Sequence, residues 1–172
     1  MPSERGITLI ELVIVVAIAG IFLVAVASYS VPMMAKETMR SAVYDVQTYM
    51  QLARMEAVGR NHDCWFVVNA STHELFVIDT LGTSTTTDDE VLYETTIPSS
   101  VVFAQPVSGT PITLALVTGK TFRTEFTSKG VVSSGAGDVY MMGGDRYGRV
   151  SVFAAGGIQV SRWDGNSWVT GS

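Results

Sequence analysis

The N-terminal third of the chain changes from continuously apolar to periodically apolar. Residues 12–31 carry no charged side chain, and as a helix they would be about 30 Å long, which matches the hydrocarbon core of a bilayer. After Pro32, apolar residues recur every three or four positions, as on a helix with one buried face: Met39, Val43, Val46, Met50, Ala53 and Ala57. Gly59 and Asn61 then supply stop signals. The pattern predicts one helix over 8–58, with its first part in lipid or a filament core and its second part against a soluble domain.

Beyond Asn61 the pattern changes to short runs rich in β-branched and aromatic residues, separated by polar or glycine-rich turns. The predicted strands are 64–69, 74–79, 91–96, 101–104, 112–117, 121–127, two that begin at Asp138 and Gly148, 157–163, and a last one at 168–169. The first two form a hairpin through a polar turn. We therefore predict an α+β protein in which an antiparallel sheet packs on the second half of the long helix.

Composition limits the possible functions. The chain has 172 residues, a formal net charge of -5 and a hydrophobic content of 47%. That is enough apolar material for a core and one membrane segment, and the acidic balance argues against nucleic-acid binding as a general function. The single cysteine, Cys64, excludes an intrachain disulfide.

Glu11 stands at the start of the apolar run, where a charge is costly. At the centre of a spanning helix it costs roughly 2.5–3.5 kcal/mol on insertion scales. A cleaved signal peptide, with 25–27 as its cleavage site, or a plain membrane anchor would accommodate the apolar run. Neither gives Glu11 a function.

A third interpretation does. The segment RGITLIELVIVVAIAGIFLV, which begins at Arg5, resembles the N-terminus of type IV pilins and type II secretion pseudopilins. The resemblance implies a leader over 1–6, cleavage by prepilin peptidase between Gly6 and Ile7, and N-methylation of Ile7. The family's usual first mature residue is Phe, so Ile7 departs from the pattern but remains apolar. Glu11 falls at the fifth mature position, where the family places the glutamate that pairs with the terminal ammonium of a neighbouring subunit and so sets subunit register.

Further segments resemble the minor pseudopilins of the GspH/FimT group. They are YMQLARMEAVGRNHD from Tyr49, TEFTSKGVVSSG from Thr124, and GRVSV from Gly148. The resemblance implies a pilin-like fold with a leader (1–6), an apolar transmembrane or filament-core helix (7–31), an amphipathic second half (32–61) and a β-rich periplasmic head (62–172).

The implied function is that of a structural minor subunit, not an enzyme, in a type II secretion pseudopilus or type IV pilus. The implied partners are other pilins or pseudopilins, prepilin peptidase, inner-membrane lipid and the assembly platform. The implied location is the bacterial inner membrane, crossed once, with the C-terminal head in the periplasm.

One alternative function is DNA capture, because FimT-like minor pilins bind DNA through a C-terminal Gly-Arg-x-Arg segment. Here Gly148 and Arg149 match it, but Ser151 replaces the second arginine, so only Arg146 and Arg149 are candidate DNA contacts. A secreted or membrane-anchored protein unrelated to pili is a further alternative.

No catalytic, metal or cofactor site is predicted. His62 and Cys64 flank Asp63 but lack further ligands, and residues 88–90 lack the spacing of a calcium loop, so we interpret them as a solvated acidic loop. Trp163 and Trp168 flank a turn and are expected to pack across a hairpin, with an exposed binding surface as the alternative.

Overall fold

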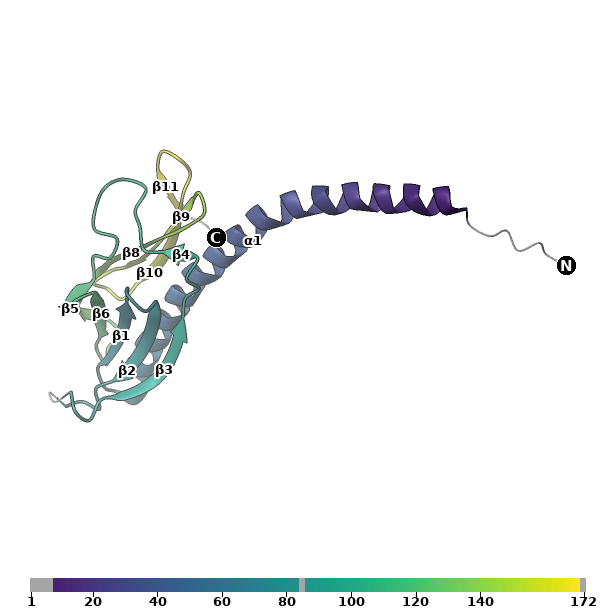
Figure 1. Ribbon diagram of the computed structural model, residues 1–172. Coiled ribbons are helices and arrows are strands. Elements are labelled where there is room, and N and C mark those ends of the chain that lie inside the picture. Colours follow the sequence, from purple (N-terminus) through teal and green to yellow (C-terminus); the bar gives the residue numbers. More distant parts are fainter. Residues whose placement is uncertain (1–7, 84–85, 171–172) are drawn as a thin grey trace. The chain divides into compact units, whose positions relative to one another are not determined.

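The computed structural model describes residues 8–83 and 86–170, with the side chains of 24–33 and 35 left out of the description (Figure 1). The chain forms two compact units, Met1–Ala35 and Lys36–Ser172. One helix, α1 (Leu9–Arg60), contributes to both. Within the described residues, no helix combines the length and the apolar character needed to span a membrane.

In the second unit, α1 presents the predicted apolar stripe to the core. All six residues of the stripe are buried, and Ala42 joins them. The helix ends at Arg60, and Asn61 follows in the left-handed region with φ 58°. Asparagine is among the few non-glycine residues that adopt this conformation readily. The amphipathic stripe and the stop signals are therefore confirmed.

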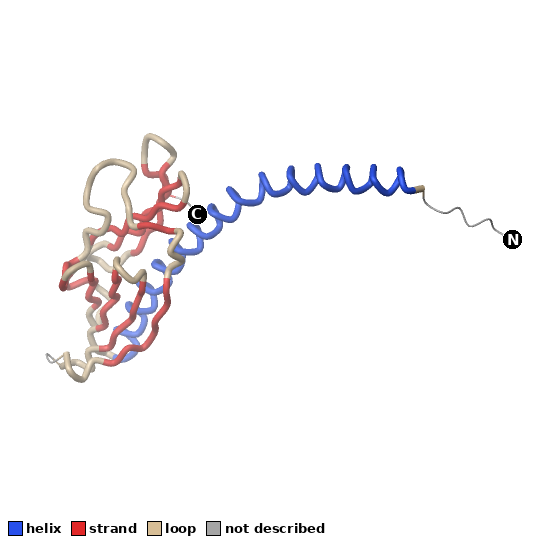
Figure 2. The backbone as a smooth tube through the Cα atoms, viewed as in Figure 1, coloured by secondary structure: helices blue, strands red, loops and turns tan. Residues whose placement is uncertain are grey.

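The strands form two antiparallel sheets (Figure 2). The six-stranded sheet has the order β3 (Glu90–Thr96), β2 (Glu74–Asp79), β1 (Cys64–Asn69), β6 (Thr121–Phe126), β5 (Ala115–Thr118), with β7 (Val132–Ser134) also paired to β6. The five-stranded sheet has the order β11 (Trp168–Thr170), β10 (Ile158–Trp163), β9 (Arg146–Val152), β8 (Gly137–Gly143), β4 (Val101–Val102).

The core lies where both sheets meet the helix. Phe66 and Phe126 from the first sheet and Met141 from the second belong to one buried cluster with Met50 of α1. Gly143 and Gly148 bring β8 and β9 so close to the helix that an added Cβ would clash with Met39 and Val43. Glycine at these two positions allows the sheet to approach the helix.

The predicted α+β class is confirmed, but one detail was wrong, since the strands form two sheets where we predicted one. The segment predicted as a strand over 112–117 explains the difference. Ile112 bridges to Val139 of the second sheet, whereas Ala115 pairs with Arg123 of the first. This short segment passes from one sheet to the other. The strand expected at 101–104 is shorter, because Phe103 leaves it to pack against the core.

Candidate functional site

The predicted assembly residues lie at the start of the chain. Gly6 and Ile7 fall outside the described residues. Glu11 is exposed in the first turn of α1, where a carboxylate interacts favourably with the helix dipole. Its backbone N–H donates to the Thr8 carbonyl at 3.1 Å and lies 3.3 Å from the Thr8 hydroxyl oxygen. Thr8 thus caps the helix, and Glu11 occupies a fixed place one turn inside it.

The helix surface that follows Glu11 is apolar on every side. The described side chains from Leu9 to Leu23 are all exposed, with exposed fractions from 49% at Ile18 to 81% at Leu9 among the large apolar residues. A helix that is apolar all round is normally buried. Here the described residues leave this surface exposed.

The two arginines considered for DNA contact differ in their surroundings. Arg146 is exposed at the start of β9, where it pairs with Gly143 of β8. Arg149 is half-buried, with its guanidinium carbon 4.9 Å from the centre of the Trp168 ring and Nη2 3.4 Å from the Ser161 hydroxyl. Arg149 therefore serves packing in the second sheet, and the geometry does not favour the DNA-binding alternative.

The packing interpretation of the two C-terminal tryptophans is confirmed. Trp163 and Trp168 are register partners on β10 and β11, with ring centres 5.4 Å apart in an edge-to-face arrangement at 61°. Tyr140 adds a third ring, 5.4 Å from Trp168. Aromatic pairs of this geometry stabilise sheets beyond the area that they bury.

The candidates around His62 also take part in structure. Cys64 is buried, and burial, followed by the nearby Asp79 carboxylate, raises the pKa of its thiol to about 12. Asp79 is itself buried and accepts hydrogen bonds from Arg60 Nη1 at 3.2 Å and from the Leu81 N–H at 2.9 Å. This contact ties the end of α1 to β2. The sequence analysis did not predict this contact. Its only signal in the sequence is that Asp79, an acid, is the last residue of an otherwise largely apolar strand.

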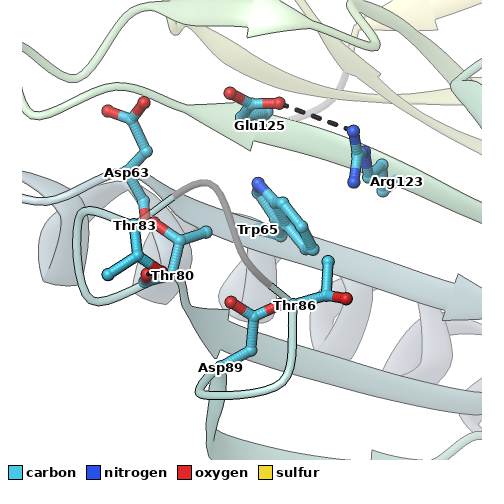
Figure 3. A pocket seen from close by; sticks show the side chains of 8 residues that line it. All are labelled: Asp63, Trp65, Thr80, Thr83, Thr86, Asp89, Arg123 and Glu125. Carbon is cyan, nitrogen blue, oxygen red and sulfur yellow. Dashed lines mark hydrogen bonds and ion pairs between the residues drawn. The ribbon is translucent and has the colours of Figure 1, made fainter.

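A polar pocket of about 240 Å³ lies beside the first sheet (Figure 3). Its lining is Asp63, Trp65, Thr80, Thr83, Thr86, Asp89, Arg123 and Glu125. The Arg123 guanidinium stacks 4.1 Å from the centre of the Trp65 ring and lies 3.9 Å from Glu125. Burial, and next the charge of Asp88, raise the pKa of Asp89. The one cation of the lining is thus already held by an aromatic face and a carboxylate.

The acidic loop is partly satisfied by its own neighbours. Asp88 accepts from the Thr83 hydroxyl at 2.9 Å, and Glu90 lies 3.7 Å from Arg60. Within residues 8–83 and 86–170, no group of three or more His, Cys, Asp or Glu side chains is placed to hold a metal ion.

Comparison with known proteins agrees with the N-terminal motif and the fold. Residues 1–27 match the prokaryotic N-terminal methylation motif, and residues 42–156 match the family described as type II transport protein GspH. No curated protein matches the chain. A similar solved structure is the minor pseudopilin EpsH from the Type 2 Secretion System of Vibrio cholerae. The likeness has a TM-score of 0.50 at 12% identity, over 71% of this chain and 94% of that one. The GspH match spans most of the chain and confirms the resemblance seen in the sequence: the chain belongs to the type II transport protein GspH family.

Proposed function

We propose that prepilin peptidase cleaves this minor pseudopilin between Gly6 and Ile7 and methylates the new amine of Ile7. The mature chain then enters the inner membrane through its apolar helix, with the head in the periplasm, and joins other pseudopilins in a type II secretion pseudopilus at the assembly platform. Its role is structural and requires no catalytic residue.

Glu11 provides register in this mechanism. Cleavage creates an ammonium on Ile7, and in a filament Glu11 lies beside the ammonium of the adjoining subunit. Opposite charges about 4 Å apart attract by about 4 kcal/mol at an effective dielectric constant of 20, although desolvation cancels much of that gain. The pair therefore specifies the axial position of each subunit, while packing of the apolar surface supplies cohesion.

The match of residues 1–27 to the N-terminal methylation motif carries the proposal. The exposed apolar surface from Leu9 to Leu23 supports it, because a helix that is apolar on every side suits both lipid and a filament core, where close packing against neighbours supplies cohesion. The position of Glu11 in the capped first turn supports the charge pair, because its exposed carboxylate is held at the start of the apolar surface that neighbouring subunits would contact.

Mass spectrometry of the N-terminus of the protein purified from its native membrane tests the processing. A chain that begins at methylated Ile7 supports the proposal. A chain that begins at Ser28 indicates a secreted protein, and an intact Met1 indicates an unprocessed anchor; either result contradicts it.

The variant Glu11→Val tests the charge pair. It should insert and be cleaved, yet be absent from sheared pseudopilus filaments. Glu37→Gln is the matched control, because Glu37 is also an exposed acid on α1 but lies outside the apolar segment; it should be incorporated normally. Normal incorporation of Glu11→Val would remove the proposed role of Glu11.

A further inference from the structure

A second cavity, which we call the seam pocket, opens where the two sheets meet in the head. It has a volume of about 350 Å³ and is lined mainly by His73, Val102, Phe103, Ile112, Lys120 and Phe122. Val102 belongs to the second sheet and Phe122 to the first. Ile112 is almost fully buried and forms part of the core, so the pocket extends from the surface to the core. Pockets of this size lined by aromatic and aliphatic side chains are typical of ligand sites.

His73 has an unusual backbone conformation and an unpaired ring nitrogen in this pocket. It is a non-glycine residue in the left-handed region, with φ 62°, and its ring stacks on Phe103 with centres 5.5 Å apart. Its Nε2 atom is buried and has no hydrogen-bond partner among the described residues. Buried polar atoms in native proteins are normally paired, and strained backbone conformations concentrate at binding sites. The backbone thus holds an unsatisfied imidazole nitrogen against an apolar wall.

The charge of the lining limits what can bind. Lys120 is exposed, and neither Asp nor Glu lines the pocket. The Lys120 ammonium is a donor, so an occupant that satisfies it presents an oxygen acceptor. The apolar walls require an apolar body of similar size, and the ring stack of His73 and Phe103 favours an aromatic one.

We propose that the seam pocket is a docking site for a protein partner, which inserts an aromatic side chain beside His73 and Phe103 and places a neighbouring Asp or Glu carboxylate against Lys120. The inference concerns the head alone and does not rest on the role of Glu11. In addition to the contacts made by the apolar part of α1, the head would then have a contact of its own with a partner.

Two small probes test the pocket in the full chain held in lipid nanodiscs. One is 3-phenylpropionate, which combines an aromatic ring with a carboxylate, and the other is the neutral 3-phenylpropanamide. Both should shift the Ile112 and Val102 methyl resonances in an NMR titration. Lys120→Gln should weaken the acid about threefold, as expected for an exposed ion pair, and leave the amide unchanged. His73→Asn, which tolerates the same backbone conformation, should weaken both.

Lys129→Gln is the control, because Lys129 is an exposed lysine outside the pocket; it should bind both probes as the unaltered protein does. Methyl resonances of Ile112 that do not respond to either probe overturn the proposal. Equal affinity of Lys120→Gln and the unaltered chain for the acid does so as well.

The kind of partner is tested by a photo-crosslinking amino acid at Val102 in secreting cells, followed by mass spectrometry of the product. A crosslinked peptide with an aromatic residue next to Asp or Glu supports the proposal. A peptide without that pair, a lipid adduct, or the absence of any protein adduct overturns it.

Discussion

The close contact between β8 and α1 predicts the effect of adding one methyl group. In Gly143→Ala the new Cβ would lie 2.5 Å from the Met39 Cβ and 2.8 Å from its Cγ, whereas ordinary contacts begin at 3.4 Å. The Met39 Cβ is fixed to the helix backbone and has no rotamer that avoids the clash, so the strand or the helix has to move by roughly 1 Å. Overpacking of this kind costs about 1–3 kcal/mol, and the lower chain entropy of alanine returns about 0.5–1 kcal/mol. From the middle of both ranges, we expect a net loss of about 1 kcal/mol in the free energy of unfolding.

Two other glycines provide matched controls. At Gly148 the added Cβ would meet the ends of flexible side chains, Met39 Cε at 2.6 Å and Val43 Cγ2 at 2.7 Å. The Met39 end can rotate away, and Val43 Cγ2, although restricted on a helix, still has a rotatable bond that Met39 Cβ lacks, so Gly148→Ala should lose less than Gly143→Ala. At Gly59, near the end of α1, nothing lies within 4 Å, and Gly59→Ala should gain about 0.5–1 kcal/mol through helix propensity.

The assay is urea denaturation of the full chain in detergent, followed by tryptophan fluorescence. All three tryptophans lie in the Lys36–Ser172 unit, so the signal reports on the head. A shifted midpoint at constant slope measures stability directly. If Gly143→Ala is as stable as the unaltered chain, or if the three variants rank in another order, the inferred close packing of β8 on the helix is refuted.

Four further predictions concern the head. Folding raises the pKa of the Cys64 thiol from 9.0 to about 12. The protonated thiol therefore contributes stability that is fully present below pH 9.0 and is lost as the pH rises through 12. Urea midpoints measured across that pH range should fall. The same thiol should resist iodoacetamide at pH 8 until the chain is unfolded, and rapid labelling of the folded chain would contradict its burial. Asp79→Ala leaves the Leu81 N–H without its acceptor and should lower the free energy of unfolding by about 1–3 kcal/mol, measured by urea denaturation against Asp145→Ala as an exposed control. Arg149→Ala should lower stability by about 0.5–2 kcal/mol through the lost stack on Trp168, with no change in salt-dependent retention on duplex DNA; a large drop in retention would restore the DNA-binding alternative.

The elements with local sequence signals were predicted well. The helix stripe from Met39 to Ala57 repeats at the helical period, and the alternation of β6 marks which of its side chains face inward. Glu11 was singled out because the N-terminal motif is contiguous in sequence, and its role in assembly stays a prediction. Each of these depends on spacing within a few residues, which a single sequence displays.

The remaining features depend on which distant segments meet. Alternation along a strand shows which face is buried but not which strand lies beside it, so the split into two sheets at Ile112 carried no local signal. The contact of Arg60 with Asp79 and the stack of Arg123 on Trp65 each join residues from separate elements. Side chains that are ordinary in sequence become a site only when the topology brings them together.

The two parts of α1 differ in how their apolar surface is covered, and in the proposed role of Glu11 this difference lets a single acid direct assembly. Between Met39 and Ala57 the chain's own sheets cover the stripe. Between Leu9 and Leu23 the large side chains have no cover from the described chain. Each one moved out of water gains about 1.5–3 kcal/mol, so a few of them offset the cost of inserting Glu11.

Lipid and a helical filament core solvate these side chains almost equally well, so the hydrophobic gain scarcely differs between a membrane-inserted subunit and an assembled one. In the proposed role, the term that does differ is the environment of Glu11, unpaired in lipid and paired in the filament. One carboxylate therefore decides between two states that a long apolar surface alone leaves nearly equal in free energy.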